Sequence, residues 1–558
     1  MPQHVDALSR SQGFEQAMDV GTFYGGTRRG VRPIPGDGDR SSDSELSDDD
    51  GQELLPCRAP SALAEESSES EDDSEDKAPP STSTSRGKKG PAKCTPNWTN
   101  TCLERDPKEI EFTGSTVMPS TIEDLDTPFQ FFKFLCPVEV FKMIREESLR
   151  YSVQCRPEKP LTVSVEELER FVGMALYMSI IQLPSTRDYW SSSIGHHKVA
   201  DVMCLNRWEE LKRFLHFNNN ETFVAPAEIG HDKLHKVRPL LNKLLEQLKI
   251  IPREEKLCID EQIVPFKGRS SLKQYNPKKP HRWGYKVFAL SGVSGFCYDF
   301  EVFSGAAENK QLPGEPDLGA SSNVVVRLSR TITRQNSHQL FFDNWFTSIP
   351  LQVFLENEGI HCLGTVRRNR LPGCTLPKET KKKERGTYEE RVCEVSGTKL
   401  SAVAWHDNKT VTLLSTFAGS EPAGEVKRYF AKEKAHKMVP CPNVVLMYNT
   451  HMGGVDLLDS MLGYYRIKIR SKKWYHRIFF HLMDLTVVNA WLLWRRQKSA
   501  KTPLLEFKSS VAEGLCRLTT MEDGTPADKH ASVARKRDTP FKDQNELRKK
   551  NSRVSDVD

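Results

Sequence analysis

The 558-residue sequence lacks the patterns that identify membrane and secreted proteins. No apolar run is long enough to span a bilayer, and the first residues, MPQHVDALSRSQGF, lack the apolar segment of a secretory signal. The 13 cysteines are scattered and form no CxxC pair, which is typical of reduced thiols rather than of a disulfide framework. These absences predict a soluble intracellular protein that has no membrane partner.

Clustered cysteines are also missing from the C-terminal part of the chain. After Cys441 the sequence contains only Cys516, and residues 519–558 contain none. A structural zinc site needs about four Cys or His ligands held close together, and His530 alone cannot supply them. The sequence therefore predicts no zinc-binding module.

Charge is unevenly distributed along the chain. The total is +5, but residues 1–100 carry −8, from 19 acidic and 11 basic side chains, which leaves about +13 for residues 101–558. A basic body suggests a polyanionic partner, although a large protein also carries surplus charge for solubility alone. The runs SSDSELSDDD and EESSESEDDSEDK have few apolar side chains to bury, so residues 1–110 are predicted to be a disordered acidic tail.

The hydrophobic pattern predicts helices first and strands after them. Apolar residues recur every three or four positions in TPFQFFKFLCPVEVFKMI and SVEELERFVGMALYMSI, and Ser164 with Glu167 predicts a capping box. Strands are predicted for KLCIDEQIVPF, WGYKVFALSG, CYDFEVFSG, SHQLFFDNWF and IHCLGTVR, which are short and rich in β-branched and aromatic residues. NVVVRLSRTI fits a helix or a strand, and SIPLQVFLENEG predicts a helix that ends at Gly359.

The later part of the chain changes character twice. Apolar residues alternate in SAVAW and TVTLLST, which predicts a small sheet inserted into the main domain, and helical patterns return after Asp456. The chain is therefore expected to be mixed α/β. The predicted boundaries are 1–110 for the acidic tail, 111–253 for a helical domain, 254–370 and 436–460 for the two parts of a core, 371–435 for the β-rich insertion, 461–518 for a helical segment and 519–558 for a charged disordered tail.

Three aspartates at the ends of apolar segments are candidates for catalysis. Asp260 lies in LCIDEQIVPF, Asp343 in LFFDNWF, and Asp456 follows two glycines in YNTHMGGVDLLD, where the glycines predict a flexible turn. Asp459 lies three positions after Asp456, on the same face of a helix. An acid on a first strand, one at the end of a neighbouring strand and one on a returning helix can converge on a pair of hard cations, as two-metal phosphoryl transfer requires. The order of elements fits a ribonuclease H-like core.

Each acid also has a purely structural explanation. In a first helical turn, Asp456 and Asp459 would complement the helix dipole. Asp260 would be a turn residue at a strand end, and Asp343 would form an Asx-type turn with Asn344. Spacing alone does not decide between these explanations.

The sequence resembles the piggyBac transposases and the piggyBac transposable element-derived proteins, from about Thr121 to Gln497. The resemblance lies in four linked motifs in the same order: IDEQIVPFKGR with NPKKPHRWGYKVF, FFDNWFTSIPL, GTVRRNR, and YNTHMGGVDLLD followed by KKWYHRIFFHLMDLTVVNAW. It implies a ribonuclease H-like core that carries an inserted β-rich domain, flanked by a helical dimerisation and DNA-binding domain.

The resemblance also implies the chemistry of a cut-and-paste DNA transposase. Asp260, Asp343 and Asp456 correspond to its catalytic triad and Asp459 to an auxiliary acid, and these four are expected to bind two Mg²⁺ or Mn²⁺ ions. The implied reaction nicks the transposon end, and the freed 3′-hydroxyl forms a hairpin that is reopened and joined to a TTAA target. Double-stranded DNA and a second copy of the chain are the expected partners, and the nucleus is the expected location.

Basic residues near these motifs are candidates for contacting phosphates, since Lys and Arg neutralise them without selecting a sequence. An aromatic side chain beside them can stack on an unpaired base. The basic candidates are Arg367, Arg370, Arg466, Lys468, Arg470, Lys472 and Lys473, and the aromatic one is Trp474. The resemblance places Arg367, Arg370 and Trp474 at positions that handle DNA. The alternatives are a solvated face for the basic cluster, a solvated loop for Lys381–Lys383 and packing in a helical core for Trp474.

Two functional hypotheses remain at this point, with a third behind them. The intact triad favours an active transposase. Family transposases commonly end in a cysteine-rich zinc module, and its absence favours a domesticated nuclear DNA-binding or chromatin protein without transposition activity. The third is a nuclease-like relative without strand transfer. Arg535–Arg537 and Arg548–Lys550 are candidates for nuclear import signals, or belong to a merely solvated tail.

Overall fold

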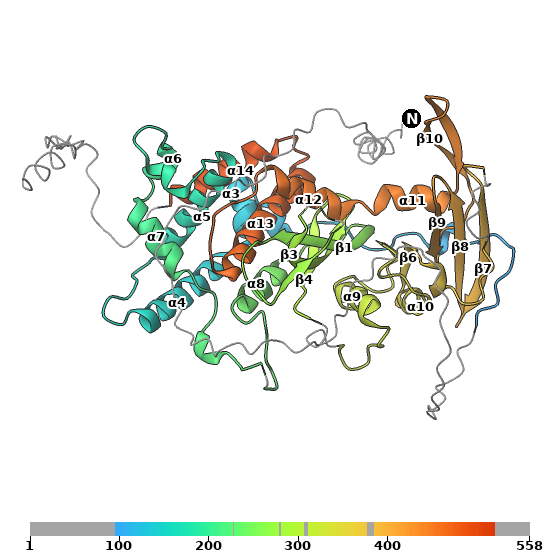
Figure 1. Cartoon of the computed structure of the whole chain (residues 1–558), viewed down its shortest axis with the longest axis horizontal. Coiled ribbons are helices and arrows are strands. Elements are labelled where there is room, and N and C mark those ends of the chain that lie inside the picture. Colours follow the sequence, from blue (N-terminus) through green and yellow to red (C-terminus); the bar gives the residue numbers. More distant parts are fainter. Residues whose placement is uncertain are drawn as a thin grey trace, which may run out of the picture. The chain divides into compact units, whose positions relative to one another are not determined.

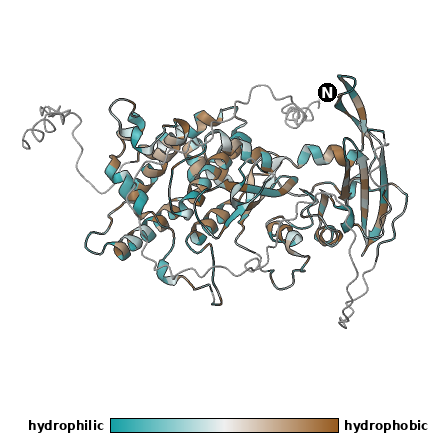
Figure 2. Ribbon diagram, in the orientation of Figure 1, coloured by the Kyte–Doolittle hydropathy of each residue, from teal (hydrophilic) through white to brown (hydrophobic). Residues whose placement is uncertain are grey.

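The computed structural model describes residues 95–518, apart from residues 227, 278, 280, 306–310 and 377–383. Several predicted features lie outside the described residues: the acidic runs, Lys381–Lys383 and the charged tail with its candidate nuclear import signals. Helices are interrupted by short loops in the first half of the described chain, and most helices carry both hydrophobic and hydrophilic residues (Figure 2).

Residues 95–110 were predicted to be disordered, and the structure corrects this prediction. Thr99 forms a bridge with Val392 on β7 (Tyr388–Val395), and the indole N–H of Trp98 donates to the carbonyl of Pro372 at 3.0 Å. These partners lie 293 and 274 positions away in the sequence. The segment has few apolar residues to indicate a core, and its order depends on hydrogen bonds to distant strands that composition cannot reveal.

The predicted helices of the first half are confirmed. Their apolar faces form one core, in which Phe131 and Phe132 are fully buried. Burial of each such side chain contributes roughly 1.5–3 kcal/mol to the free energy of folding. Ser164 caps its helix by accepting from the Glu167 backbone N–H, while the Glu167 carboxylate accepts from Arg207. The helices are α2 (Ser120–Glu123), α3 (Pro128–Leu135), α4 (Val138–Cys155), α5 (Val165–Ile180), α6 (His197–Ala200), α7 (Leu205–Phe214) and α8 (Arg238–Lys249).

A large mixed sheet occupies the second half of the described chain. Its strands run in the order β2-β3-β1-β5-β6-β9-β8-β7, and β4 also pairs with β3. β1 and β5 are parallel, as are β5 and β6, whereas β1–β3 and β3–β4 are antiparallel. The bounds of the first strands, green in Figure 1, are β1 (Lys256–Pro265), β2 (Lys273–Tyr275), β3 (Trp283–Gly292) and β4 (Cys297–Val302), and the next two are β5 (His338–Phe342) and β6 (Ile360–Thr365).

Two helices lie between these strands in the sequence. The ambiguous NVVVRLSRTI segment forms α9 (Ala320–Ser329), and α10 (Ile349–Asn357) ends before Gly359, whose φ of +73° is the left-handed conformation predicted for it. All the core strands predicted from the sequence are confirmed. β2 was not predicted, because three residues are too few to show an alternating pattern.

The predicted small inserted sheet is not a separate sheet. β7, β8 (Thr398–His406) and β9 (Thr410–Ser415) continue the main sheet, because β9 pairs with β6 in the register Gly364↔Leu414. The edge of β6 thus obtains a hydrogen-bonding partner. β10 (Gly424–Phe430) and β11 (Ala435–Cys441) form a second, two-stranded sheet that was not predicted, since charged residues interrupt its apolar alternation.

Four helices complete the described chain: α11 (Asn443–His451), α12 (Gly454–Tyr464), α13 (Trp474–Lys498) and α14 (Leu504–Cys516). α12 packs on β1 and β3, and α14 packs on α5 and α3. Among the described helices none has the length and apolar character needed to cross a membrane. The fold is therefore mixed α/β, with one large sheet that carries the candidate site, and the predicted domain boundaries stay predictions.

Candidate active site

Two neighbouring parallel strands bring Asp260 and Asp343 to the same region of the sheet. Ile259 on β1 is paired with Phe342 on β5, and each candidate acid directly follows one member of this pair. Adjacent strands lie about 4.8 Å apart, so the two carboxylates are neighbours. The charge of Asp343 is one of the influences that raise the pKa of Asp260, after burial and Glu261.

α12 places Asp456 over the same strands because its first residue has no side chain. A Cβ atom on Gly454 would lie 2.3 Å from the carbonyl oxygen of Gly292 and 2.8 Å from the Sγ of Cys258. Any larger residue would push the helix away from β1 and β3. The two glycines were predicted to form a flexible turn, but Gly454 is the first residue of the helix and allows close packing. Gly453 precedes the helix, and a Cβ atom added to it would have no atom within 4 Å.

Lys279 lies between two of the candidate acids. Its Nζ is 3.7 Å from Oδ2 of Asp260 and 3.7 Å from Oδ1 of Asp456. Burial lowers the pKa of Lys279. The surrounding carboxylates, led by Asp260 and Asp456, together raise this pKa by more than burial lowers it, so the net shift is upward. The lysine therefore supplies the positive charge that these acids need in the described structure.

The fourth acid is joined to the same strand by a glutamine. The side-chain amide of Gln262 donates to Asp459, and Gln262 lies two residues after Asp260 on β1, so both project from one face of the sheet. Burial raises the pKa of Asp459 to about 6, against the opposing effects of Gln262 and the Arg466 charge. Asp456 and Asp459 thus face the same strand, as the helical spacing predicted.

Burial makes the ionised form of Asp260, Asp343 and Asp459 less favourable. Burial also raises the pKa of Asp260 to about 7 and that of Asp343 above its usual value. A carboxylate whose ionised form is this unfavourable gains from a cation placed beside it. The raised pKa values are typical of functional sites, although buried structural acids show them too.

Asp343 forms the Asx-type turn that was considered as the alternative to catalysis. Its Oδ1 accepts from the backbone N–H of Trp345 at 2.7 Å. The guanidinium of Arg370 donates to three carbonyls of the same loop, those of Asn344, Trp345 and Thr347, at 3.1, 2.9 and 2.8 Å. The turn holds the Asp343 carboxylate in one orientation, which is compatible with a catalytic role.

No metal centre is assembled among residues 95–518 as far as they are described, because no group of three or more His, Cys, Asp or Glu side chains is arranged to hold an ion. The donor set nevertheless fits a hard cation. It consists of carboxylate oxygens, which Mg²⁺ and Mn²⁺ prefer. The ammonium of Lys279 already lies where two of these carboxylates attract positive charge.

The predicted DNA-binding residues differ in their surroundings. Arg367, Lys468, Arg470 and Lys472 are exposed, and Arg466 is half-buried. Ile467 and Ile469, which alternate with the basic residues, are buried. Arg370 is only half-exposed, because its guanidinium donates to the loop that follows Asp343.

Lys473 and Trp474 make contacts with the body of the protein. The Lys473 amine donates to the carbonyl of Arg213 at the end of α7 and lies 4.8 Å from the ring of Tyr151. Trp474 is half-buried, and its ring lies 6.3 Å from that of Tyr285. The packing considered as the alternative for Trp474 is therefore present, and its role in DNA binding stays a prediction.

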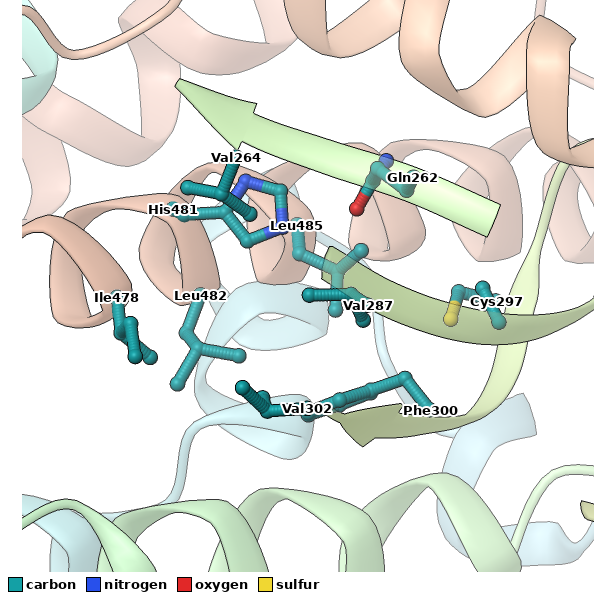
Figure 3. A pocket seen from close by; sticks show the side chains of 11 residues that line it. Gln262, Val264, Val287, Cys297, Phe300, Val302, Ile478, His481, Leu482 and Leu485 are labelled. Atoms are coloured by element: carbon teal, nitrogen blue, oxygen red, sulfur yellow. The ribbon is translucent and has the colours of Figure 1, made fainter. Parts of the chain in front are cut away.

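A small apolar pocket lies between β1, β3, β4 and α13. Figure 3 shows Gln262 and His481 among the apolar side chains that line it. Burial lowers the pKa of His481 to about 3, so this histidine is neutral. Gln262 therefore lies between the apolar side chains of α13 and the carboxylate of Asp459.

Sequence reasoning missed Lys279 and Gln262. The period of two along β1 was a usable signal for Gln262, because residues 260 and 262 of a strand share a face. Lys279 gave no such signal. It lies in the loop between β2 and β3, and only the folding of that loop over the sheet brings it to Asp260 and Asp456.

Comparisons with known proteins agree on one family. The family model described as Transposase IS4 matches residues 127–491. PiggyBac transposable element-derived protein 3 of Homo sapiens is 32% identical over 392 residues, which cover 69% of this chain and 64% of that protein. PiggyBac transposable element-derived protein 2 of Homo sapiens is 30% identical over 414 residues, covering 72% of this chain and 68% of that protein.

A solved structure is also similar. It is a piggyBac transposase in a synaptic complex with hairpin DNA, and it matches with a TM-score of 0.59 and 22% identity over 71% of this chain and 82% of that one. At this identity the match shows the fold. The chain spans just under two-thirds of the length of the derived protein 3.

Proposed function

The chain belongs to the piggyBac family of transposases and transposable element-derived proteins, and on this premise we propose that it cleaves and joins DNA strands with Asp260, Asp343 and Asp456. The observations that support the proposal are pairwise: Asp260 follows the β1 residue that is paired with the residue before Asp343, and Asp260 shares the Lys279 ammonium with Asp456. We further propose that the strands around them are a ribonuclease H-like core, because an acid on each of these elements suits that core.

Each residue of the site has a proposed role. Asp260, Asp343 and Asp456, with Asp459 beside them, would hold two Mg²⁺ or Mn²⁺ ions. When bound, the ions would activate the attacking oxygen and stabilise the leaving oxygen. Gln262 orients Asp459. Arg370 fixes the loop that carries Asp343, so that this carboxylate stays beside Asp260.

The substrate proposed for this site is double-stranded DNA with hairpin formation and joining at TTAA. The exposed Arg367, Lys468, Arg470 and Lys472 support a polyanionic substrate, because exposed cations neutralise phosphates. The hairpin DNA in the solved piggyBac transposase complex also supports it. A homodimer and a nuclear location are part of the same proposal and rest on the family alone.

A second candidate function is a DNA-binding protein that no longer transposes. The position of Lys279 between Asp260 and Asp456 favours it, since the lysine neutralises carboxylates that an active site would use for metal ions. The relatives that match over most of this chain are themselves named as element-derived proteins.

The joining of a pre-cut, TTAA-ended duplex into a plasmid separates the two functions. With Mg²⁺ or Mn²⁺ present, wild type should join the DNA, and Asp260→Asn should lose the activity by roughly a hundredfold or more. Asp299→Asn is the matched control, because Asp299 is a half-buried acid on β4, a strand that pairs with β3 and not with β1 or β5, and burial raises its pKa to about 6. No joining by folded, DNA-binding wild type would support the second function instead.

A further inference from the structure

Two large aromatic side chains are exposed side by side on the hairpin formed by β2 and β3. Tyr275 and Trp283 are cross-strand partners, and they are 47% and 50% exposed. Their ring centroids lie 4.7 Å apart at an angle of 46°. The Lys273 ammonium lies 4.9 Å from the centre of the Trp283 ring. Adjacent exposed aromatic rings leave apolar surface in water, which is typical of a binding site.

This aromatic pair lies on the sheet face that carries Asp260. Side chains alternate along a strand, so Trp283, Tyr285, Val287 and Ala289 share one face of β3. Ala289 is paired with Asp260 on β1, which places both on that face. The six steps along the strand from Trp283 to Ala289 span about 20 Å at roughly 3.4 Å per residue. A DNA strand that has a phosphate near Asp260 would therefore reach the pair within a few nucleotides.

The pair is the exposed end of a row of aromatic residues. Tyr285, the next residue on the same face, is fully buried and lies 5.0 Å from Phe266 and 6.3 Å from Trp474, measured between ring centroids. Trp474 was the residue predicted to stack on a base, but it lies at the half-buried, inner end of the row. The rings that a base can reach are those of Tyr275 and Trp283.

The surrounding sequence has one sign of charge. Residues 267–283 contain six Lys or Arg residues and no Asp or Glu. Arg269 and Arg282 are exposed near the two ends of this stretch. The loop within it also delivers Lys279 to Asp260, which ties the stretch to the candidate active site. Cations that bind a backbone and aromatic rings that stack on bases together form the usual binding site for a single strand.

We propose that Tyr275 and Trp283, with Lys273, form a platform on which bases of an unpaired DNA strand stack beside the active site. The proposal rests on the proposed function and specifies the form of DNA that the site takes. A base can reach the rings only when it is unstacked from its neighbours, so the platform selects single-stranded extensions over fully paired duplex. The Lys and Arg side chains of residues 267–283 would hold the phosphates of the same strand.

The test uses the full chain and two probes of equal duplex length. One probe is fully paired, and the other carries a ten-nucleotide single-stranded extension with 2-aminopurine. Wild type should bind the extended probe more tightly and quench its 2-aminopurine fluorescence. Tyr275→Leu combined with Trp283→Leu should remove the quenching and weaken binding of the extended probe by roughly 10- to 100-fold, without changing binding of the paired probe.

Two further variants control for damage to the fold. Tyr429→Leu removes another exposed aromatic side chain, 52% exposed on β10, and should behave like wild type. Tyr275→Phe combined with Trp283→Phe keeps two rings and should retain most of the quenching.

The outcomes separate this proposal from the proposed function. If the double leucine variant binds and quenches like wild type, or loses both probes equally, the platform is overturned while DNA binding by the chain stands. If wild type binds neither probe, the proposed function and the platform fail together.

Discussion

Two lysines of this protein each lie beside aspartates, and they differ in almost every other respect. Lys508 on α14 lies 2.8 Å from Asp484 on α13, and both side chains are only 3% exposed. Lys279 lies in a loop, 3.7 Å from each of Asp260 and Asp456, and it is 22% exposed. We call the buried Lys508–Asp484 pair closed, and we call the partly exposed site of Lys279 with Asp260 and Asp456 open.

The hydrogen bonds around each lysine explain the difference. Lys508 also donates to the carbonyl of Tyr465, and Asp484 accepts from the backbone N–H of Ile467. These bonds fasten the segment that follows α12 and satisfy both charged groups. Around Lys279 the contacts are longer, and the pKa of Asp260 remains raised. A closed pair serves the fold, whereas an open one leaves charge that a ligand can use.

Breaking the closed pair should have the largest effect on stability. Lys508→Met leaves Asp484 buried without its cation, and it should lower the free energy of unfolding by about 3–5 kcal/mol, measured by urea denaturation. Adding Asp484→Leu should recover part of the loss, because no lone charge then remains. A loss below about 1 kcal/mol in the single variant would show that Asp484 finds another partner.

Displacing α12, which carries Asp456 of the open site, should have the next largest effect on stability. Gly454→Ala places a methyl group against the Gly292 carbonyl, 2.3 Å away in the present backbone. The expected loss in the free energy of unfolding is roughly 1–3 kcal/mol, because the packed helix must shift. Gly453→Ala, where nothing lies within 4 Å, is the matched control and should change stability far less. Equal effects of the two variants would contradict the close-packing role of Gly454.

The acids of the open site should make stability depend on pH. In the folded protein burial raises the pKa of Asp260 to about 7 and that of Asp459 to about 6, from ordinary values of 3.8. The folded state therefore holds protons that the unfolded state releases. The resulting stabilisation is fully present below about pH 4 and is lost as the pH rises through 6 to 7.

Urea denaturation at pH 5 and pH 8 without divalent ions measures this dependence. Asp260→Asn should reduce the fall in stability between the two values, because an amide does not titrate. Asp317→Asn is the control. Asp317 is an exposed acid whose pKa is lowered by hydrogen bonds from Asn323 and Gly319, so its replacement should not reduce the fall. An unchanged fall in Asp260→Asn would show that this carboxyl titrates normally.

Removing the lysine of the open site should have the smallest effect on stability. Lys279→Met should change the free energy of unfolding by less than about 1 kcal/mol, because the contacts are long and partly solvated. Without the competing charge, Mn²⁺ should bind roughly tenfold more tightly in isothermal titration calorimetry. Lys142→Met is the control, since Lys142 lies 3.9 Å from Glu139 within α4 and touches none of the candidate acids. Weaker Mn²⁺ binding in Lys279→Met would assign the lysine a supporting role instead.

The order of the elements could be predicted because local patterns produce it. The strands around Asp260 and Asp343 are short apolar segments, and the helix after Asp456 follows from residues spaced at three and four positions. Register could not be predicted, and register decides that Asp260 and Asp343 are neighbours. The continuation of the main sheet through β9 also depends on which edge is available, and that is a property of the whole fold.

The sequence by itself determined the mixed α/β class, the family and the three candidate aspartates, because these follow from local spacing and linked motifs. Only the tertiary structure decided what surrounds those aspartates. It placed Lys279 between two of them and Gln262 against Asp459. It also left Trp474 half-buried against Tyr285 while exposing Trp283. The physical reason is that exposure and charge compensation depend on loops folding across the sheet, and no local pattern encodes that path.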